Sequence, residues 1–183
     1  MTAVEPPASA YDMGHKAETE SLATFAILVD NEPGVLHRVV GLFSARGYNI
    51  ESLTVAETDP SAHTSRITIV TRGTPHVLAQ IEAQLQKMVS TRHVQNVTKD
   101  PNGVERELAL IKVRGVGAER VEALRIADIF RAHAVDTTNE SFVFEIAGAT
   151  DKVDAFIQLM EPLGLADVSR TGVVAIARGP HPL

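Results

Sequence analysis

The sequence contains neither cysteine nor tryptophan among its 183 residues. Without cysteine, the chain cannot form a disulfide, a thiolate nucleophile, a cysteine-ligated zinc site or an iron–sulfur cluster. Proteins without disulfides are typical of the reducing cell interior, so we expect a cytoplasmic protein. No apolar run approaches the ~18 residues that span a bilayer, and the N-terminus lacks the basic start and apolar stretch of a signal peptide. We therefore expect no membrane partner.

Basic residues are also scarce. The 17 lysines and arginines are outnumbered by 23 acidic residues, which gives a net charge of −6. Nucleic-acid-binding proteins usually need clustered cations to displace counterions, so we expect no nucleic-acid partner. Aromatic residues are few, with six phenylalanines and two tyrosines, but 44% of all residues are hydrophobic. The chain can therefore bury a core, and aliphatic side chains must supply most of it.

The first half of the chain shows a leader followed by one folded unit. Residues 1–20 carry prolines and scattered charges without periodicity, which predicts a disordered leader. A run apolar on both faces begins at Leu22, and apolar residues recur at a spacing near 3.6 from Val35 to Phe43, which indicates an amphipathic helix. In this unit, 21–98, we expect a strand over 22–29, a helix over 35–46, strands over 49–58 and 66–71, a helix over 77–88 and a strand over 92–98.

The second half repeats the same order after a linker at 99–104. In this unit, 105–183, we expect a strand over 108–113, a helix over 118–132, strands over 134–138 and 142–147, a helix over 153–160 and a last strand over 173–177. The fold class is therefore α+β, with two ferredoxin-like βαββαβ units in tandem. Two helices on one face of each sheet leave the other face uncovered, which favours self-association.

Residue patterns for catalysis or metal binding are hard to find. The seven histidines are scattered, no Gly-x-Ser-x-Gly motif occurs, and no acid/base pair stands out, so we predict no catalytic or metal-binding residue. Gly115 and Gly117, with Asp136 downstream, have the layout of a dinucleotide-binding turn, but Arg120 replaces the third glycine. Too few residues follow for a doubly wound sheet. A plain strand-to-helix turn is therefore favoured over a nucleotide-binding turn, and so over an enzyme built on it.

The segment 30–56 is a candidate binding site. Asn31 and Gly34 flank the start of the first helix, where free N–H groups and the helix dipole favour a carboxylate. Gly34 lets a ligand approach the backbone, and the Asn31 amide can both donate and accept, which suits a zwitterion. The alternative is that Asn31 caps the helix and Pro33 starts its first turn, and local physics alone favours this cap.

The sequence is similar to a known family in several motifs, which run from about residue 22 to 178. They are DNEPGVL (30–36), RGYNIESLTV (46–55), VEREL (104–108) and SRTGV (169–173). These motifs resemble the small, regulatory subunit of acetolactate (acetohydroxyacid) synthase, and RGYNIESLTV is the most specific of them. The resemblance implies an N-terminal ACT domain followed by a second ferredoxin-like regulatory domain.

The resemblance also implies a function. A small subunit carries no active site and no cofactor; it binds a large catalytic subunit that holds thiamine diphosphate, Mg²⁺ and FAD. It raises the activity of that subunit in branched-chain amino acid biosynthesis and confers feedback inhibition, most often by valine. Leucine and isoleucine are not distinguished from valine, because a methylene changes binding by only ~1–3 kcal/mol. The other possibility is a tandem ACT-type sensor that regulates a different enzyme or transcription.

The family's effector site implies which residues bind the amino acid. It lies between the ACT domains of a homodimer, with an asparagine and a glycine from one chain and an asparagine from the other. In this sequence they match Asn31 and Gly34, with Asn49 from the partner. Val35 and Ile50 adjoin them and are expected to supply backbone groups and apolar contacts.

Overall fold

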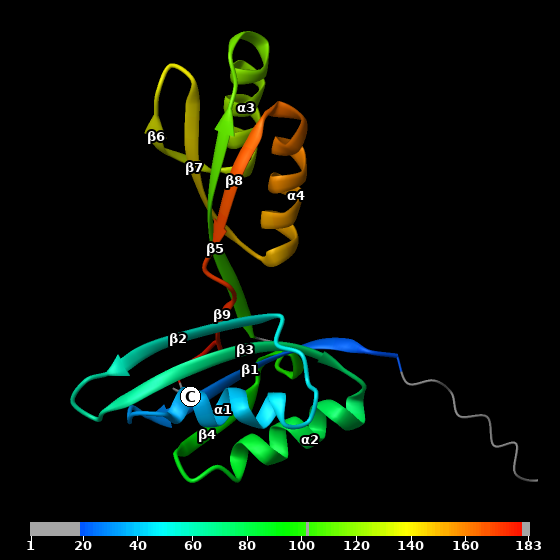
Figure 1. Ribbon diagram of the computed structural model, residues 1–183, viewed down its shortest axis with the longest axis vertical. Coiled ribbons are helices and arrows are strands. Elements are labelled where there is room, and N and C mark those ends of the chain that lie inside the picture. Colours follow the sequence, from blue (N-terminus) through cyan, green and yellow to red (C-terminus); the bar gives the residue numbers. More distant parts are fainter. Residues whose placement is uncertain (1–18, 102, 181–183) are drawn as a thin grey trace, which may run out of the picture.

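The computed structural model describes residues 19–101 and 103–180 and contains two α+β units joined by one long strand (Figure 1). The leader predicted over 1–20 lies outside the described residues up to position 18, as does position 102 of the predicted linker. Each unit is an antiparallel sheet with two helices, so the predicted fold class of two ferredoxin-like units is confirmed. Within the described ranges, no helix is long and apolar enough to cross a membrane.

The first unit forms a sheet in the order β2-β3-β1-β4. Its elements are β1 (Ser21–Asp30), α1 (Val35–Ser44), β2 (Ser52–Asp59), β3 (Thr64–Gly73), α2 (Pro75–Gln86) and β4 (Thr91–Asn96), followed by a 3₁₀ turn, η1 (Val97–Lys99). Both helices lie on the same side of this sheet (Figure 1).

Alternation along the central strand β1 creates the core of the first unit. Phe25 and Ile27 point toward the helices and are fully buried, and they pair with Ile69 and Ile67 of β3. Helix α1 adds Val39 and Phe43 to this core, while α2 adds Leu78, Ile81 and Leu85. The helical spacing of these apolar residues thus fixes which face of each helix meets the sheet.

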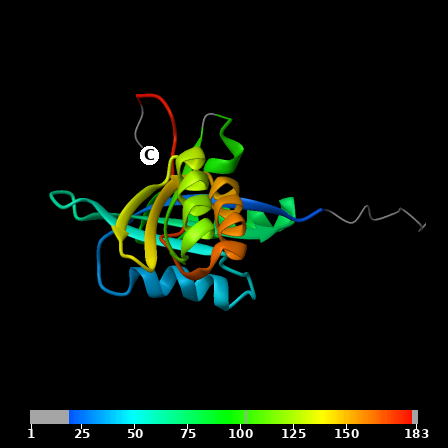
Figure 2. The ribbon, with the colours of Figure 1, turned by 90° about the horizontal axis from the view of Figure 1, so that it is seen from above.

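The second unit forms a sheet in the order β6-β7-β5-β8. Its elements are β5 (Val104–Arg114), α3 (Gly117–Phe130), β6 (His133–Thr137), β7 (Ser141–Gly148), α4 (Thr150–Met160), η2 (Glu161–Leu163), β8 (Leu165–Arg170) and β9 (Val174–Ile176). Helices α3 and α4 lie side by side, as Figure 2 shows from above. Phenylalanines supply much of the core between helices and sheet, and the Phe144 and Phe156 rings meet edge to face at 6.1 Å.

The end of the second unit differs from the sequence prediction. The fourth strand of the sheet is β8, which the hydrophobic pattern missed, because its ladder with β5 shifts register between Lys112 and Val113 and breaks the alternation. The strand predicted over 173–177 exists as β9 but lies outside the β6-β7-β5-β8 path. It pairs with Val104–Arg106, the first residues of β5, below the rest of the second sheet.

The second unit stands on the helix-free face of the first sheet (Figure 1). Strand β5 rises from this face, and β9 runs beside its lower end. Ala175 of β9 packs against Ala26 of β1 and Val97 in a small buried cluster. Part of the face that the sequence left uncovered is therefore covered by a segment of the same chain.

Candidate functional site

The first set of predicted site residues lies in the loop between β1 and α1. Two main-chain hydrogen bonds hold the start of this loop. The Asn31 N–H donates to the His63 carbonyl at 2.7 Å, and the Asp30 N–H donates to the Ser90 carbonyl at 2.9 Å. The Arg92 guanidinium forms an ion pair with the Asp30 carboxylate at 2.6 Å. The loop thus leaves the sheet in a defined direction, beside the hairpin turn that contains His63.

Asn31 is not the cap of α1, contrary to the alternative that local physics favoured. The N-cap position is Gly34, and no side chain caps the helix there. The Asn31 amide instead reaches strand β2, where its Nδ2 donates to Glu57 Oε1 at 3.1 Å. The cap interpretation failed because the helix begins at Val35, one turn later than a cap at Asn31 requires. Asn31 is therefore available for another role.

Gly34 adopts a backbone conformation that favours glycine, with a φ of +84°. A Cβ on Gly34 would have no neighbour within 4 Å, so the space beside the start of α1 is open. The first turn of α1 contains no acidic residue and no side-chain cap. Free N–H groups and the helix dipole at such an end attract a carboxylate. Val35 is only 7% exposed, so its side chain serves the core and leaves little surface for a ligand.

Sequence reasoning missed the role of Glu32 in holding this loop. The Glu32 carboxylate accepts hydrogen bonds from the Ser90 hydroxyl and from the Arg38 guanidinium, the latter at 2.6 Å. Arg38 also donates to the Ser90 hydroxyl at 2.8 Å. The Ser90 hydrogen bond, and then the Arg38 charge, hold the pKa of Glu32 below its ordinary value. The link to Ser90 crosses 58 positions, so no local motif indicates it.

The second set of predicted site residues, Asn49 and Ile50, lies between α1 and β2. The backbone carbonyl of Asn49 accepts a hydrogen bond from the Thr71 hydroxyl at 2.6 Å. The side-chain Nδ2 of Asn49 donates to Glu51 Oε1 at 3.0 Å. Ile50 is partly buried and packs against the core of the first unit. These contacts hold the backbone just before β2 begins at Ser52.

Within one chain, the structure does not bring the two sets together. Helix α1 has 10 residues and separates Asn31 from Asn49, and a helix of that length spans about 15 Å. Asn31 and Gly34 therefore lie at one end of α1, while Asn49 and Ile50 lie beyond the other. A single amino acid is too small to touch both ends of this helix at once.

The two asparagines share one electrostatic arrangement. Each donates from Nδ2 to a glutamate, Asn31 to Glu57 and Asn49 to Glu51. Among the described residues, neither asparagine Oδ1 accepts a hydrogen bond. A carboxamide oxygen next to a carboxylate suits an ammonium group, while the open start of α1 suits a carboxylate. The residues thus have the chemistry to bind an amino acid zwitterion.

The glycine turn at 115–117 does not form a nucleotide site. Helix α3 begins at Gly117, and Arg120 stacks its guanidinium over the Phe142 ring at 3.8 Å from the centroid. Arg120 therefore stands against the core where a nucleotide fingerprint needs glycine. In the parts of the chain that the structure describes, no group of three histidine, aspartate or glutamate side chains could hold a metal ion.

Comparison with known proteins gives consistent matches to both units. The family model described as the small subunit of acetolactate synthase matches residues 106–179. The model of the AHAS small subunit-like ACT domain matches residues 25–93. Both units of the chain thus match models of the same subunit.

Individual relatives agree over nearly the whole chain. The probable acetolactate synthase small subunit of Archaeoglobus fulgidus is 47% identical over 156 residues, covering 85% of this chain and 96% of the relative. The acetolactate synthase small subunit of Haemophilus influenzae is 48% identical over 155 residues, covering 84% and 94%. The crystal structure of the small subunit from Thermotoga maritima has a TM-score of 0.79 at 38% identity, covering 88% of this chain and 99% of that one. The chain therefore belongs to the acetolactate synthase small-subunit family.

Proposed function

We propose that this chain is the regulatory subunit of an acetolactate synthase. In this proposal it binds a large catalytic subunit, raises its activity and makes it sensitive to valine. Thiamine diphosphate, Mg²⁺ and FAD belong to the large subunit, and this chain holds no cofactor and no catalytic residue. The assembly works in the cytoplasm in branched-chain amino acid biosynthesis. The family membership supports the subunit role, and the chemistry around Asn31 and Asn49 supports an amino acid effector.

The observation that carries the proposal is the placement of the two sets of site residues at opposite ends of α1. Two copies related by a twofold axis can place the Asn31 end of one helix beside the Asn49 end of the other. Each site would then take Asn31 and Gly34 from one protomer and Asn49 and Ile50 from its partner. A homodimer through the ACT domains thus creates two equivalent sites.

Inhibition follows from linkage between the site and the arrangement of the dimer. A ligand shifts an equilibrium only by binding one arrangement more tightly than another. Valine bridging two protomers favours the arrangement that closes the site. This arrangement must activate the large subunit less well than the open one, because otherwise valine binding would leave the activity unchanged.

The first experiment measures acetolactate formation by the purified cognate large subunit, with and without this chain, across valine, leucine and isoleucine titrations. We expect activation by the chain and reversal of that activation by valine. Activation that only leucine or isoleucine reverses would replace the effector and keep the subunit role. No effect on the large subunit would overturn the proposal and favour an ACT-type sensor of another enzyme. Analytical ultracentrifugation of the chain alone tests the expected dimer.

A further inference from the structure

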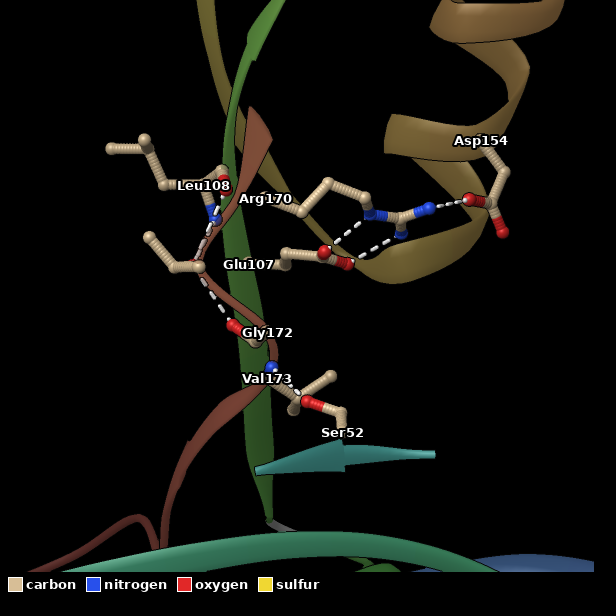
Figure 3. Close-up of polar contacts among 8 residues, drawn as sticks. Ser52, Glu107, Leu108, Asp154, Arg170, Gly172 and Val173 are labelled. Atoms are coloured by element: carbon tan, nitrogen blue, oxygen red, sulfur yellow. Dashed lines mark hydrogen bonds and ion pairs between the residues drawn. The ribbon is translucent and has the colours of Figure 1, made fainter. Parts of the chain in front are cut away.

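A segment of the second unit lies directly on β2, the strand that follows Asn49 and Ile50. This crossing segment comprises residues 171–176. The Val173 N–H donates to Ser52 Oγ at 3.0 Å, and the Thr54 hydroxyl donates to the Val173 carbonyl at 2.9 Å. Both backbone polar groups of Val173 are thus satisfied by two side chains of β2, 121 and 119 positions away. Figure 3 shows the contact with Ser52.

Gly172 makes this close approach possible. Its φ is +83°, which glycine adopts without strain. A Cβ at this position would lie 2.5 Å from Ser52 Oγ and 3.3 Å from Thr54 Cγ2. The backbone of the crossing segment therefore rests on the same two side chains that bind Val173, and a side chain at position 172 would have to displace them.

The upper end of the crossing segment is fixed to the second unit. The Thr171 N–H donates to the Leu108 carbonyl of β5 at 3.0 Å. The preceding residue, Arg170, forms a two-bond ion pair with Glu107, with Nη2 and Oε2 at 2.7 Å, and reaches Asp154 of α4 at 2.7 Å (Figure 3). The Glu107 side chain is only 4% exposed. A displacement of the crossing segment would therefore be passed to β5 and α4.

Among the described residues, the crossing segment adds a second connection between the units to the covalent one. Strand β5 is the covalent connection, and a single strand can bend and swivel. Because β9 pairs with Val104–Arg106 and the crossing segment binds β2, the connection becomes a ribbon attached to the first sheet at a second point. The orientation of the second unit is then set by the position of Ser52 and Thr54.

We propose that Ser52 and Thr54 are positioning residues through which the crossing segment transmits effector binding to the second unit. Only Glu51 separates Ser52 from Ile50, so a ligand that orders Asn49 and Ile50 also sets the backbone position of Ser52. The crossing segment moves with it and reorients the second unit relative to the first. This inference rests on the proposed function for its effector but not for the contact itself.

The first test measures the orientation of the two units in the full chain. Because the chain has no cysteine, Ala83→Cys on α2 and Ala118→Cys on α3 give two unique positions for spin labels, and both alanines are exposed. With the labelled chain diluted in an excess of unlabelled chain, so that a homodimer adds no distances between protomers, we expect one narrow distance distribution. Ser52→Ala combined with Thr54→Val in the labelled chain should broaden it. Thr58→Val is the matched control, because Thr58 lies on the same strand but bonds only within its own hairpin. A distribution unaffected by the double variant would overturn the proposal.

A second pair of variants tests the glycine. Gly172→Ala should broaden the distribution in the same way, since its Cβ pushes the crossing segment off β2. Gly179→Ala introduces the same strain at a φ of +99° but meets no atom within 4 Å, so it should leave the distribution narrow. Equal broadening by both alanine variants would contradict the proposed contact. Circular dichroism melting checks that each variant is folded.

The holoenzyme separates transmission from binding. With Ser52→Ala and Thr54→Val together, we expect valine affinity within about threefold of wild type, while the maximal inhibition falls to less than about half. A loss of affinity that accounts for the whole loss of inhibition would indicate a merely structural role and overturn the proposal. If valine leaves the wild-type holoenzyme uninhibited, the proposed effector fails, while the distance measurement still decides on the crossing segment.

Discussion

Asn31 is the residue whose substitution best separates regulation from activation. Its side chain reaches Glu57 and does not cap α1, so removing it should leave the helix intact. We expect Asn31→Ala to activate the large subunit normally while weakening valine inhibition. Losing the hydrogen bonds should cost ~1–3 kcal/mol, or roughly 5- to 150-fold in affinity. Valine titration of acetolactate formation measures this shift.

Asn139→Ala provides the control for this variant. Asn139 lies exposed in the turn before β7, in the second unit. The substitution therefore removes the same type of side chain at a position away from the proposed site. Its inhibition curve should match that of the wild type. An Asn31→Ala curve that coincides with both would show that Asn31 binds no effector.

Arg170 is the residue on which the buried charge of Glu107 depends. Arg170→Met leaves a carboxylate that is 4% exposed without its cation. Breaking a buried pair from one side typically costs ~3–5 kcal/mol, and we expect about 3 kcal/mol here because Arg170 is itself partly exposed. Urea unfolding at neutral pH measures the loss.

The double variant tests the cause of that loss. Glu107→Gln removes the charge that needs a partner, so combining it with Arg170→Met should cost less than the two single losses added together. Strict additivity would mean that the pair is not coupled, despite its two hydrogen bonds. A loss below about 0.5 kcal/mol in Arg170→Met would place it among ordinary surface substitutions.

At the scale of elements, hydrophobic periodicity predicted the helices and most strands but hid part of β5. The prediction began this strand at Leu108, whereas it begins at Val104. The first residues of β5, VEREL, look polar in the sequence, in part because Glu107 is charged. The side chain of Glu107 is nevertheless buried. The charge is tolerated because Arg170, 63 positions later, pairs with it. A contact of this range leaves no trace in local periodicity.

The loop before α1 shows the same limit for the candidate site. The sequence located Asn31 and Gly34 beside the helix start, but it could not decide whether Asn31 caps the helix. That depended on the left-handed backbone of Gly34, which delays the helix to Val35. Ser90 and Glu32 were missed entirely, because their contact joins two loops far apart in the chain. Residue types are readable locally, whereas partners between loops are not.

The loop element should respond to pH through Glu32. Its pKa is lowered by the Ser90 hydroxyl and the Arg38 charge, so the ionised form stabilises the folded loop. A lowered folded-state pKa gives stability that is present above the ordinary value of 4.5 and is lost as pH falls through the folded value. Glu32→Gln lacks this dependence. We expect the melting-temperature difference between wild type and Glu32→Gln to shrink as pH falls below 4.5.

Ser90→Ala tests the cause of this pH dependence. It removes the hydroxyl whose hydrogen bond contributes most to the lowered pKa of Glu32. In the Ser90→Ala background, the effect of Glu32→Gln should therefore change less with pH. If the Glu32→Gln difference stayed constant down to acid pH, the contacts of Glu32 with Ser90 and Arg38 would contribute no stability in solution.

At the scale of the whole molecule, the proposed effector site is separated in space from the second unit. The predicted effector residues lie at the two ends of α1, on the first unit, while the second unit stands on the opposite face of the sheet. In the proposed arrangement, the effector lies on one side of β2 and the crossing segment on the other. A change in the dimer interface can reach the second unit through the sheet or through this segment.

The shared site makes a prediction about mixed dimers. Asn31→Ala and Asn49→Ala should each abolish tight valine binding in a homodimer. In a dimer of one variant with the other, one site combines both alanines, but the second site combines both intact asparagines. With equal mixing, about half of the dimers combine the two variants, and one of the two sites in each is intact. Tight binding should therefore return at about one quarter of all sites. Isothermal titration of co-refolded chains measures this stoichiometry.

The outcome decides where the site lies independently of any enzyme assay. If Asn31 and Asn49 served a site within one chain, every chain of the mixture would carry one damaged site, and mixing would restore nothing. Co-refolding either variant with itself gives the matching baseline. Recovery in the mixture alone requires that the two asparagines come from different protomers, because the 10 residues of α1 keep them apart within each one. The dimer would then be the smallest unit able to sense the effector.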